Sequence, residues 1–252
     1  MARNTRELKD ALAIQKYSAA EKKYAETIVF VHFFDGSPQL IKRHIQFVND
    51  LGYDAYAYQV SFHIKNRPVK DFLPQHKRLG FKNFWTKDLE RVLEQVEGAK
   101  IIYAFSNPAS AAFEAAAKGK YNIKAIICDS GPFFDLFKCS RNLIREYFKV
   151  KNPLLNIPSS IGLATVLAPL HETYINKDLA SLPKNFPILS IRGWQDQLVP
   201  KDAIEKVFAK HSHLDLEVLN LPDAGHVNGL KDFADDYKPV VTDFLERNSS
   251  KI

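Results

Sequence analysis

Three side chains with complementary chemistry stand far apart in the 252-residue sequence: Ser106, Asp196 and His226. A serine hydroxyl becomes an effective nucleophile when a base with a pKa near 7, most often histidine, removes its proton. A carboxylate behind the imidazole holds the required tautomer and stabilises the cation that forms. The set therefore predicts nucleophilic catalysis, with Ser106 attacking, His226 carrying the proton and Asp196 orienting His226.

The sequence around Ser106 indicates where its hydroxyl lies. An apolar run from Ile101 to Phe105 precedes it, and alanine-rich sequence with helical spacing follows as far as Lys118. A buried strand that leads into a helix places such a serine at the carboxyl edge of a sheet, beside unpaired helix N–H groups. Considered alone, the serine is better explained as a helix cap, the commonest role of serine at this position. The presence of Asp196 and His226 further along favours the nucleophile.

Further strands are predicted where short apolar runs end in loops, and helical patterns lie between them. The runs cover residues 27–31, 55–60, 125–128, 187–191 and 214–221, and 11–17 could be a short edge strand. This alternation predicts an α/β fold, with a mostly parallel sheet flanked by helices. Asp196 and His226 follow the last two runs, and loops at the carboxyl ends of parallel strands are where such sheets build sites.

The alternation stops between residues 133 and 184. This segment is apolar and helical in pattern, with several phenylalanines, and it interrupts the strands at the edge that carries the candidate site. We therefore predict a core formed by residues 1–132 and 185–252, with residues 133–184 inserted as a helical lid.

Two loop motifs carry a family resemblance. The sequence GWQDQLVP at residues 193–200 resembles the acid loop G-x-x-D-x-x-V-P of the α/β-hydrolase superfamily, and AGH at 224–226 resembles its histidine loop. The chain order Ser, Asp, His is also the order of that superfamily. The resemblance covers roughly residues 26–247. It implies a serine hydrolase with the triad Ser106, Asp196 and His226 and with neither a cofactor nor a metal ion.

The segment around the serine departs from the pattern of that superfamily. The usual G-x-S-x-G reads A-F-S-N-P at residues 104–108. Ala104 adds a single methyl group, and Pro108 supplies a φ near −65° that suits an early helical position. Sterics therefore permit the sharp turn that exposes the serine.

The oxyanion of a tetrahedral intermediate needs two preformed N–H donors. The N–H of Asn107, directly after the serine, is one candidate. The second should come from the loop after the strand at 27–31, where Phe34 is the first choice and Phe33 remains open. His32, in the same loop, is expected to pack beneath it. Asp129, which also ends a strand, is the rival of Asp196 as the triad acid.

The composition and charge of the chain indicate which classes of binding partner to expect. The net charge is +6, but there is no basic stripe with interleaved aromatics, no zinc-ligand spacing and no helix-turn-helix signal, so nucleic acid is not expected. A basic loop from Lys65 to Lys82 is either a solvated surface or a site that attracts an anionic substrate or membrane surface. A monomer or a homodimer is equally compatible with the sequence.

Location is predicted from what the sequence lacks. The charged N-terminus does not resemble a signal peptide, and the apolar stretch 154–170 is short and interrupted by prolines, so no transmembrane segment is expected. Cys128 ends an apolar run and is expected to be a buried free thiol. These features predict a cytoplasmic protein.

Three functions are compatible with these residues. The first is hydrolysis of a carboxylic ester or thioester, with a small-molecule acyl substrate. The alternative is a binding protein that uses the same fold with weak or no catalysis, because fold alone does not establish function. The third is peptidase or acyltransferase chemistry with the same triad.

Overall fold

A single seven-stranded sheet organises the computed structural model, which describes residues 13–60, 80–168 and 170–252. The strand order is β1-β3-β2-β4-β5-β6-β7, and only β1 runs antiparallel to its neighbour. The strands are β1 (Ile14–Tyr17), β2 (Thr27–Val31), β3 (Ala55–Tyr58), β4 (Lys100–Phe105), β5 (Ile123–Asp129), β6 (Pro187–Gly193) and β7 (Asp215–Leu221). The mostly parallel α/β architecture predicted from the sequence is confirmed.

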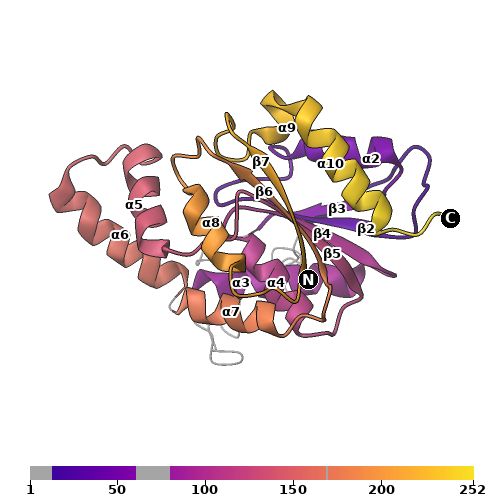
Figure 1. Cartoon of the computed structure of the whole chain (residues 1–252), viewed down its shortest axis with the longest axis horizontal. Helices are drawn as coiled ribbons and strands as arrows, with labels where there is room; N and C mark the ends of the chain where they lie inside the picture. The colour runs from indigo at the N-terminus through magenta and orange to yellow at the C-terminus, as the bar shows by residue number, and fades with distance from the viewer. Residues whose placement is uncertain (1–12, 61–79, 169) are drawn as a thin grey trace, which may run out of the picture.

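Helices cover both faces of the sheet (Figure 1). One layer holds α2 (Lys42–Leu51), α9 (Gly229–Asp232) and α10 (Ala234–Arg247). The other holds α3 (Phe81–Gln95), α4 (Ala109–Ala117), α7 (His171–Ala180) and α8 (Lys201–Phe208). Because both faces are covered, the central strands are apolar on both sides, and every residue of β2 and of β4 is buried.

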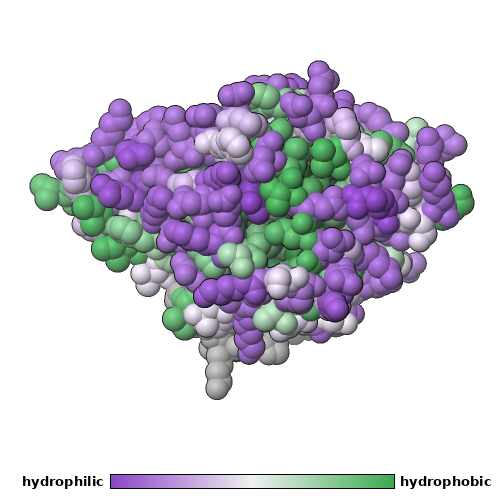
Figure 2. All heavy atoms as spheres, in the orientation of Figure 1, coloured by the Kyte–Doolittle hydropathy of each residue, from purple (hydrophilic) through white to green (hydrophobic). Residues whose placement is uncertain are grey.

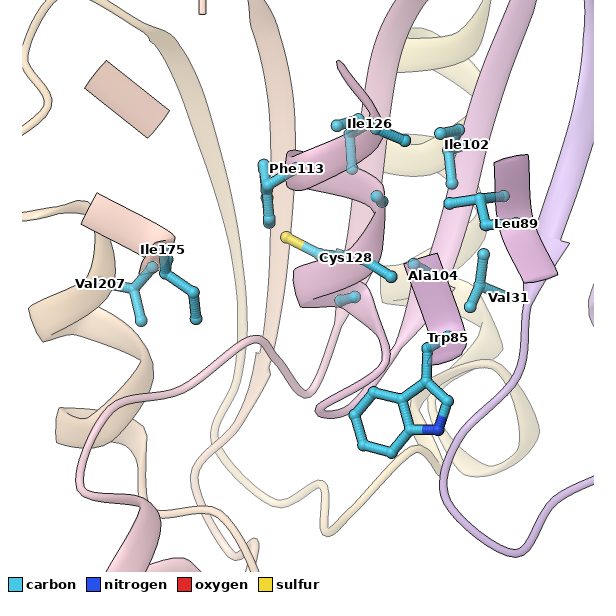
Figure 3. Close-up of a cluster of buried hydrophobic side chains, with 14 of the residues drawn as sticks. Val31, Trp85, Leu89, Ile102, Ala104, Phe113, Ile126, Cys128, Ile175 and Val207 are labelled. Carbon is cyan, nitrogen blue, oxygen red and sulfur yellow. The ribbon is translucent and has the colours of Figure 1, made fainter. Parts of the chain in front are cut away.

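The core is divided by the sheet into two clusters. On the side of α3 and α4, Trp85, Phe113 and Ile126 pack with neighbours that include Cys128 and Val207 (Figure 3). On the side of α10, the second cluster contains Phe30, Tyr103, Tyr237 and Phe244. These two clusters fix the strand ends that carry the candidate site.

Two helices of the predicted lid stand away from the sheet. These are α5 (Leu136–Glu146) and α6 (Pro153–Leu167), which lie at the left end of the molecule in Figure 1. In contrast, α7 packs in the core, where Ile175 and Leu179 are fully buried. The division of the chain at residues 133–184 stays a prediction, but only α5 and α6 project within that segment.

The start of α2 differs from its local sequence pattern. Ser37 followed by Pro38 is typical of a helix start, but residues 38–41 form a turn and α2 begins at Lys42. The reason is that Leu40 N–H donates to Ser37 O and Lys42 N–H to Gln39 O, the i→i+3 pattern of tight turns. Gly52 ends the helix in the left-handed conformation, which glycine adopts without steric strain.

The basic loop is shorter than the sequence indicates. Helix α3 begins at Phe81, so Lys82 is helical, and its buried ammonium lies 3.3 Å from a carboxylate oxygen of Asp178 and 3.9 Å from one of Glu114. The expectation that Lys82 belongs to a solvated loop is therefore wrong. The rest of the expected loop, residues 65–79, lies outside the described residues, and its interpretation stays a prediction.

Candidate active site

Ser106 occupies a strained turn between β4 and α4. Its φ is 54°, in the left-handed region that L-residues other than glycine rarely adopt. The turn is held because Ser106 N–H donates to Asp129 O at 2.8 Å and Ala109 N–H donates to Ser106 O at 3.1 Å. No side chain caps α4, so the alternative role of Ser106 as a helix cap is wrong. Strained backbone of this kind is concentrated at functional sites.

Gly131, in the loop after β5, leaves room for the backbone of the turn at Ser106. A Cβ on Gly131 would lie 2.2 Å from Ser106 O and 2.5 Å from its carbonyl carbon. Real Cβ atoms do not approach backbone so closely, so only glycine allows the β5 loop to pass the serine. Ala104, where the superfamily has glycine, is fully buried at the end of β4.

Asp196 and His226 contact each other directly. His226 Nδ1 lies 2.6 Å from Asp196 Oδ2. The other oxygen, Asp196 Oδ1, accepts from Leu198 N–H and Val199 N–H, each at 2.8 Å. The carboxylate is therefore fixed by its own loop, and its Oδ2 favours the tautomer of His226 that carries the proton on Nδ1.

The acid and histidine loops are held against each other by their backbones. Gln195 N–H donates to Ala224 O at 2.9 Å, and a Cβ on Gly193 would lie 2.6 Å from that same oxygen. Gly193 is therefore required for the two loops to meet. This contact explains physically why a glycine precedes the aspartate in the motif.

Asp129, the rival acid, takes part in a buried hydrogen-bond network. Its carboxylate accepts from Tyr237 Oη at 2.8 Å and from Ser130 Oγ at 2.9 Å, and Tyr103 Oη bonds to Tyr237 Oη. The residue that contacts His226 is Asp196, which was the preferred choice from the sequence.

Ser130 was missed by sequence reasoning, yet it connects this network to the histidine loop. Its Oγ accepts from Val227 N–H at 3.0 Å, next to His226. Val227 has a φ of 56°, which is rare for a β-branched residue and is compensated by this hydrogen bond. The only signal in the sequence was the position of Ser130 directly after a strand.

Burial raises the pKa of Asp129 to about 6, although hydrogen bonds from Tyr237 and Ser130 oppose the rise. The folded protein thus binds this proton more tightly than the unfolded chain, whose Asp129 has a pKa near 3.8. Asp129 stabilises the fold fully below pH 3.8, and this contribution is lost as the pH rises through 6.

The stability of the wild type relative to Asp129→Asn should therefore rise by about 2 kcal/mol as the pH falls from 8 to 4, which is most of the roughly 3 kcal/mol that the whole pKa shift represents at about 1.4 kcal/mol per pKa unit. Urea denaturation of both proteins at several pH values measures this difference. A difference that does not change with pH contradicts the assignment.

A cavity of about 280 Å³ collects most of the predicted site residues. Ser106, Asn107, Phe34 and His226 all line it, and Asp196 lies behind His226. The remaining wall is mainly apolar and comes from the core and from α5 and α6: Phe33, Asp35, Leu40, Trp85, Phe133, Leu136, Cys139, Ser140, Leu143, Tyr147, Leu167, Leu198 and Val199. An apolar pocket with a few polar groups at one point is typical of a small-molecule site.

The proposed oxyanion donors lie at this cavity. Within the described chain, Asn107 N–H donates to no backbone carbonyl, and its buried side-chain oxygen has no partner. Phe33 and Phe34 both line the cavity, so the choice between them stays open. His32 lies beneath this loop, because its Nδ1 donates to Phe33 O and its Nε2 accepts from Val60 N–H, both at 2.9 Å.

The serine hydroxyl and His226 both border the cavity, but no hydrogen bond joins them in the part of the chain that the structure describes. Contacts between nucleophile and base are often long without substrate and tighten in the reacting complex. The arrangement therefore supplies a strained serine, an oriented imidazole and backbone donors around one cavity.

Both cysteines are buried and free, as predicted for Cys128. Cys139 lines the cavity, but burial raises the pKa of its thiol, which disfavours the reactive thiolate. Across residues 13–60, 80–168 and 170–252, no three histidine, cysteine or acidic side chains gather as a metal site would require.

Several solved structures have a fold similar to that of this chain. An esterase from Pyrococcus furiosus matches with a TM-score of 0.66 and 18% identity over 97% of this chain and 93% of that one. A monoacylglycerol lipase from Paleococcus ferrophilus matches with a TM-score of 0.64 and 13% identity, covering 95% and 100% of the two chains. MenH from S. aureus matches with a TM-score of 0.63 and 16% identity, covering 93% and 98%.

Similarity at the level of sequence is much weaker. No family model matches the chain, and no curated protein matches it either. The comparisons therefore bear on the fold, and the chemistry has to be argued from the site itself.

Proposed function

We propose that this chain, which has the α/β-hydrolase fold, is a serine hydrolase that cleaves a carboxylic ester or thioester with an apolar acyl group. The observation that carries the proposal is the 2.6 Å contact between His226 and Asp196 at a cavity that the strained Ser106 also lines. The solved esterases and lipase with this fold support the same class of reaction.

In the first half of the reaction, Ser106 Oγ attacks the carbonyl carbon while its proton passes to His226 Nε2. Asp196 stabilises the resulting imidazolium through the Nδ1 contact. The carbonyl oxygen becomes an oxyanion, for which Asn107 N–H and a second N–H from Phe34 or Phe33 are the donors. The tetrahedral intermediate then expels the alcohol or thiol, which takes the proton from His226, and leaves an acyl group on Ser106.

In the second half, water attacks the acyl carbon and gives one proton to His226 Nε2. Collapse of the second intermediate breaks the bond to Ser106 Oγ, which recovers the proton, and the carboxylic acid leaves. These steps use only residues of this chain and water, and they require no cofactor. The free, buried cysteines support a reducing compartment such as the cytoplasm for this reaction.

The wall of the cavity indicates the acyl part of the substrate. Phe133, Leu136 and Leu143 supply apolar surface beside the serine, and Trp85 contributes an aromatic ring. A pocket of about 280 Å³ with this lining favours an acyl chain of medium length over a charged or strongly polar group.

A series of p-nitrophenyl esters of rising chain length tests this proposal. We expect kcat/KM to increase from acetate to medium-length acyl esters, by roughly tenfold for every two methylenes accommodated, because each buried methylene contributes about 0.8 kcal/mol. Aminopeptide p-nitroanilides measured in parallel serve as the control for peptidase chemistry. Faster cleavage of the peptides, or no preference among the esters, contradicts the proposal.

A binding protein without catalysis remains the second candidate. The observation in its favour is that no hydrogen bond joins Ser106 Oγ to His226 Nε2 among the described residues. A fluorophosphonate probe separates the two candidates, because it modifies a serine that is activated for attack and leaves an inert serine unmodified.

A further inference from the structure

Helix α6 has the reverse of the usual distribution of polar and apolar side chains. Its buried positions include Asn156 and Ser160, whereas Leu154 and Ile161 are 82% and 53% exposed. No charged residue occurs from Asn152 to Leu170. A helix of a globular protein normally buries its apolar face in the core and presents polar residues to water.

The inward polar residues are satisfied, so α6 is held in this orientation. The amide of Asn156 donates to Val150 O at 2.9 Å and to Arg141 O at 3.3 Å. Ser160 Oγ donates to Asn156 O at 2.6 Å. Rotation of the helix would separate the Asn156 amide from Val150 O and Arg141 O, whereas the Ser160 bond lies within the helix, so the Asn156 contacts keep the apolar side chains on the outside.

The exposed apolar residues form one patch at the end of the molecule formed by α5 and α6. Figure 2 shows hydrophobic residues gathered at this end, to the left of the view. The patch contains Leu154, Leu155, Ile157, Ile161 and Val166, and Tyr147 and Phe148 continue it toward α5. A contiguous apolar patch of this kind marks an interaction surface.

Basic residues lie on α5 and in the segment that joins α5 to α6. Between residues 136 and 170 the charged side chains are Lys138, Arg141, Arg145, Lys149 and Lys151, with Glu146 as the one acidic residue. All five basic residues are exposed; Arg145 pairs with Glu146, and Lys138 pairs with Asp202. Apolar side chains beside basic ones complement a lipid surface with anionic headgroups.

The geometry favours a helix that lies on a bilayer. The stretch Pro153–Ala180 could cross a membrane by length and composition, which is weak evidence by itself. However, α7 packs in the core through Ile175 and Leu179, and the 15 residues of α6 span only about 22 Å at about 1.5 Å per residue. That is shorter than the roughly 30 Å hydrocarbon core.

A second copy of this chain is a less suitable partner for the apolar patch than an anionic lipid surface. In a two-fold symmetric contact each copy uses the same surface. The basic residues beside one patch would then face those beside the other, and juxtaposed like charges oppose association.

We propose that α6 inserts its exposed apolar side chains into the headgroup–acyl boundary of an anionic phospholipid bilayer, with these basic residues on the lipid headgroups. Leu143 of α5, Leu167 of α6 and Tyr147, directly after α5, line the cavity beside Ser106. Docking would therefore bring the cavity close to lipid. The proposal rests on α5 and α6 and does not depend on catalysis by Ser106.

Cosedimentation of the full chain with lipid vesicles tests the proposal. The vesicles are phosphatidylcholine alone or a 3:1 mixture with phosphatidylglycerol, at about 0.1 M salt. We expect binding to the anionic vesicles, weakened at least about tenfold in the double variant Leu154→Glu/Ile161→Glu. Ile252→Glu, at an apolar residue that is 74% exposed near the C-terminus, is the matched control and should bind as the wild type does.

A second pair of variants tests the charge. Lys149→Glu/Lys151→Glu should lose most binding, whereas Lys124→Glu/Lys210→Glu, the same charge change at exposed lysines elsewhere, should retain it apart from a small effect of net charge. Circular dichroism verifies that all variants are folded. Ser106→Ala should bind as strongly as the wild type, so failure of docking and failure of the proposed hydrolysis are distinguishable.

Three results would overturn the proposal. The first is equal sedimentation with neutral and anionic vesicles, or none with either. The second is binding that the substitutions in α6 leave unchanged. The third is a wild-type dimer in vesicle-free buffer that Leu154→Glu/Ile161→Glu dissociates, which would assign the patch to self-association.

Discussion

Ser106→Ala should lower kcat toward esters by about 10⁶-fold while leaving the protein folded, because the attacking oxygen is removed and little else changes. The substitution deletes one hydroxyl that makes no hydrogen bond among the described residues, so the turn between β4 and α4 should persist. Single-turnover kinetics and thermal unfolding measure the two quantities on the same samples.

The same variant tests whether the protein is an enzyme that uses Ser106 as its nucleophile. Stoichiometric labelling of the wild type by a fluorophosphonate, lost in Ser106→Ala, supports the nucleophile. Ser110→Ala is the matched control, because Ser110 is a fully buried serine one helical turn further on. Retention of full activity by Ser106→Ala would exclude the proposed mechanism, and an unlabelled, inactive wild type would favour the binding protein.

Asp196→Asn should lower kcat by about 10⁴-fold with little change in KM. The isosteric amide still accepts from Leu198 N–H and Val199 N–H at its oxygen. Its NH₂ group then faces His226 Nδ1 and favours the tautomer with the proton on Nε2, where the base is needed. The pH dependence of kcat, measured for both proteins with one ester, shows whether the general base has been affected.

Asp129→Asn is the control for Asp196→Asn, because both replace a buried carboxylate near the same histidine. Asp129 bonds to Tyr237 and Ser130 and has no hydrogen bond to His226. We therefore expect a far smaller loss of kcat, together with the pH-dependent change in stability described above. A loss as large as that of Asp196→Asn would mean that the wrong carboxylate has been assigned.

Much of the fold could be predicted from the pattern of apolar runs. The run at 27–31 became β2 with the same limits, and the run ending at Phe105 became the central β4. These strands are covered on both faces, so their sequences are continuously apolar and easy to recognise. The boundaries of α2 and α3 could not be read in the same way, because tight turns before Lys42 and the burial of Lys82 depend on tertiary contacts.

The residues of the candidate site could be predicted as far as their chemical types indicate a function. Ser106, Asp196 and His226 were identified by type, by order along the chain and by their positions after strands. The contact between Asp196 and His226 is present, whereas the roles of these residues in catalysis remain predictions. Ser130 and Tyr237 were missed because their importance depends on which side chains face one another across β5 and α10.

For this protein, the sequence by itself determined the mostly parallel sheet, the sheet edge that carries the candidate site and the types of residue at that edge. These features could be predicted because hydrophobic periodicity and the ends of strands are local properties of the sequence. Only the tertiary structure decided which carboxylate contacts His226 and that α6 presents its apolar side chains outward. It also decided that residue 131 must be glycine, because a Cβ there would clash with the backbone of Ser106. Those outcomes depend on distances between segments far apart in the chain, which packing alone establishes.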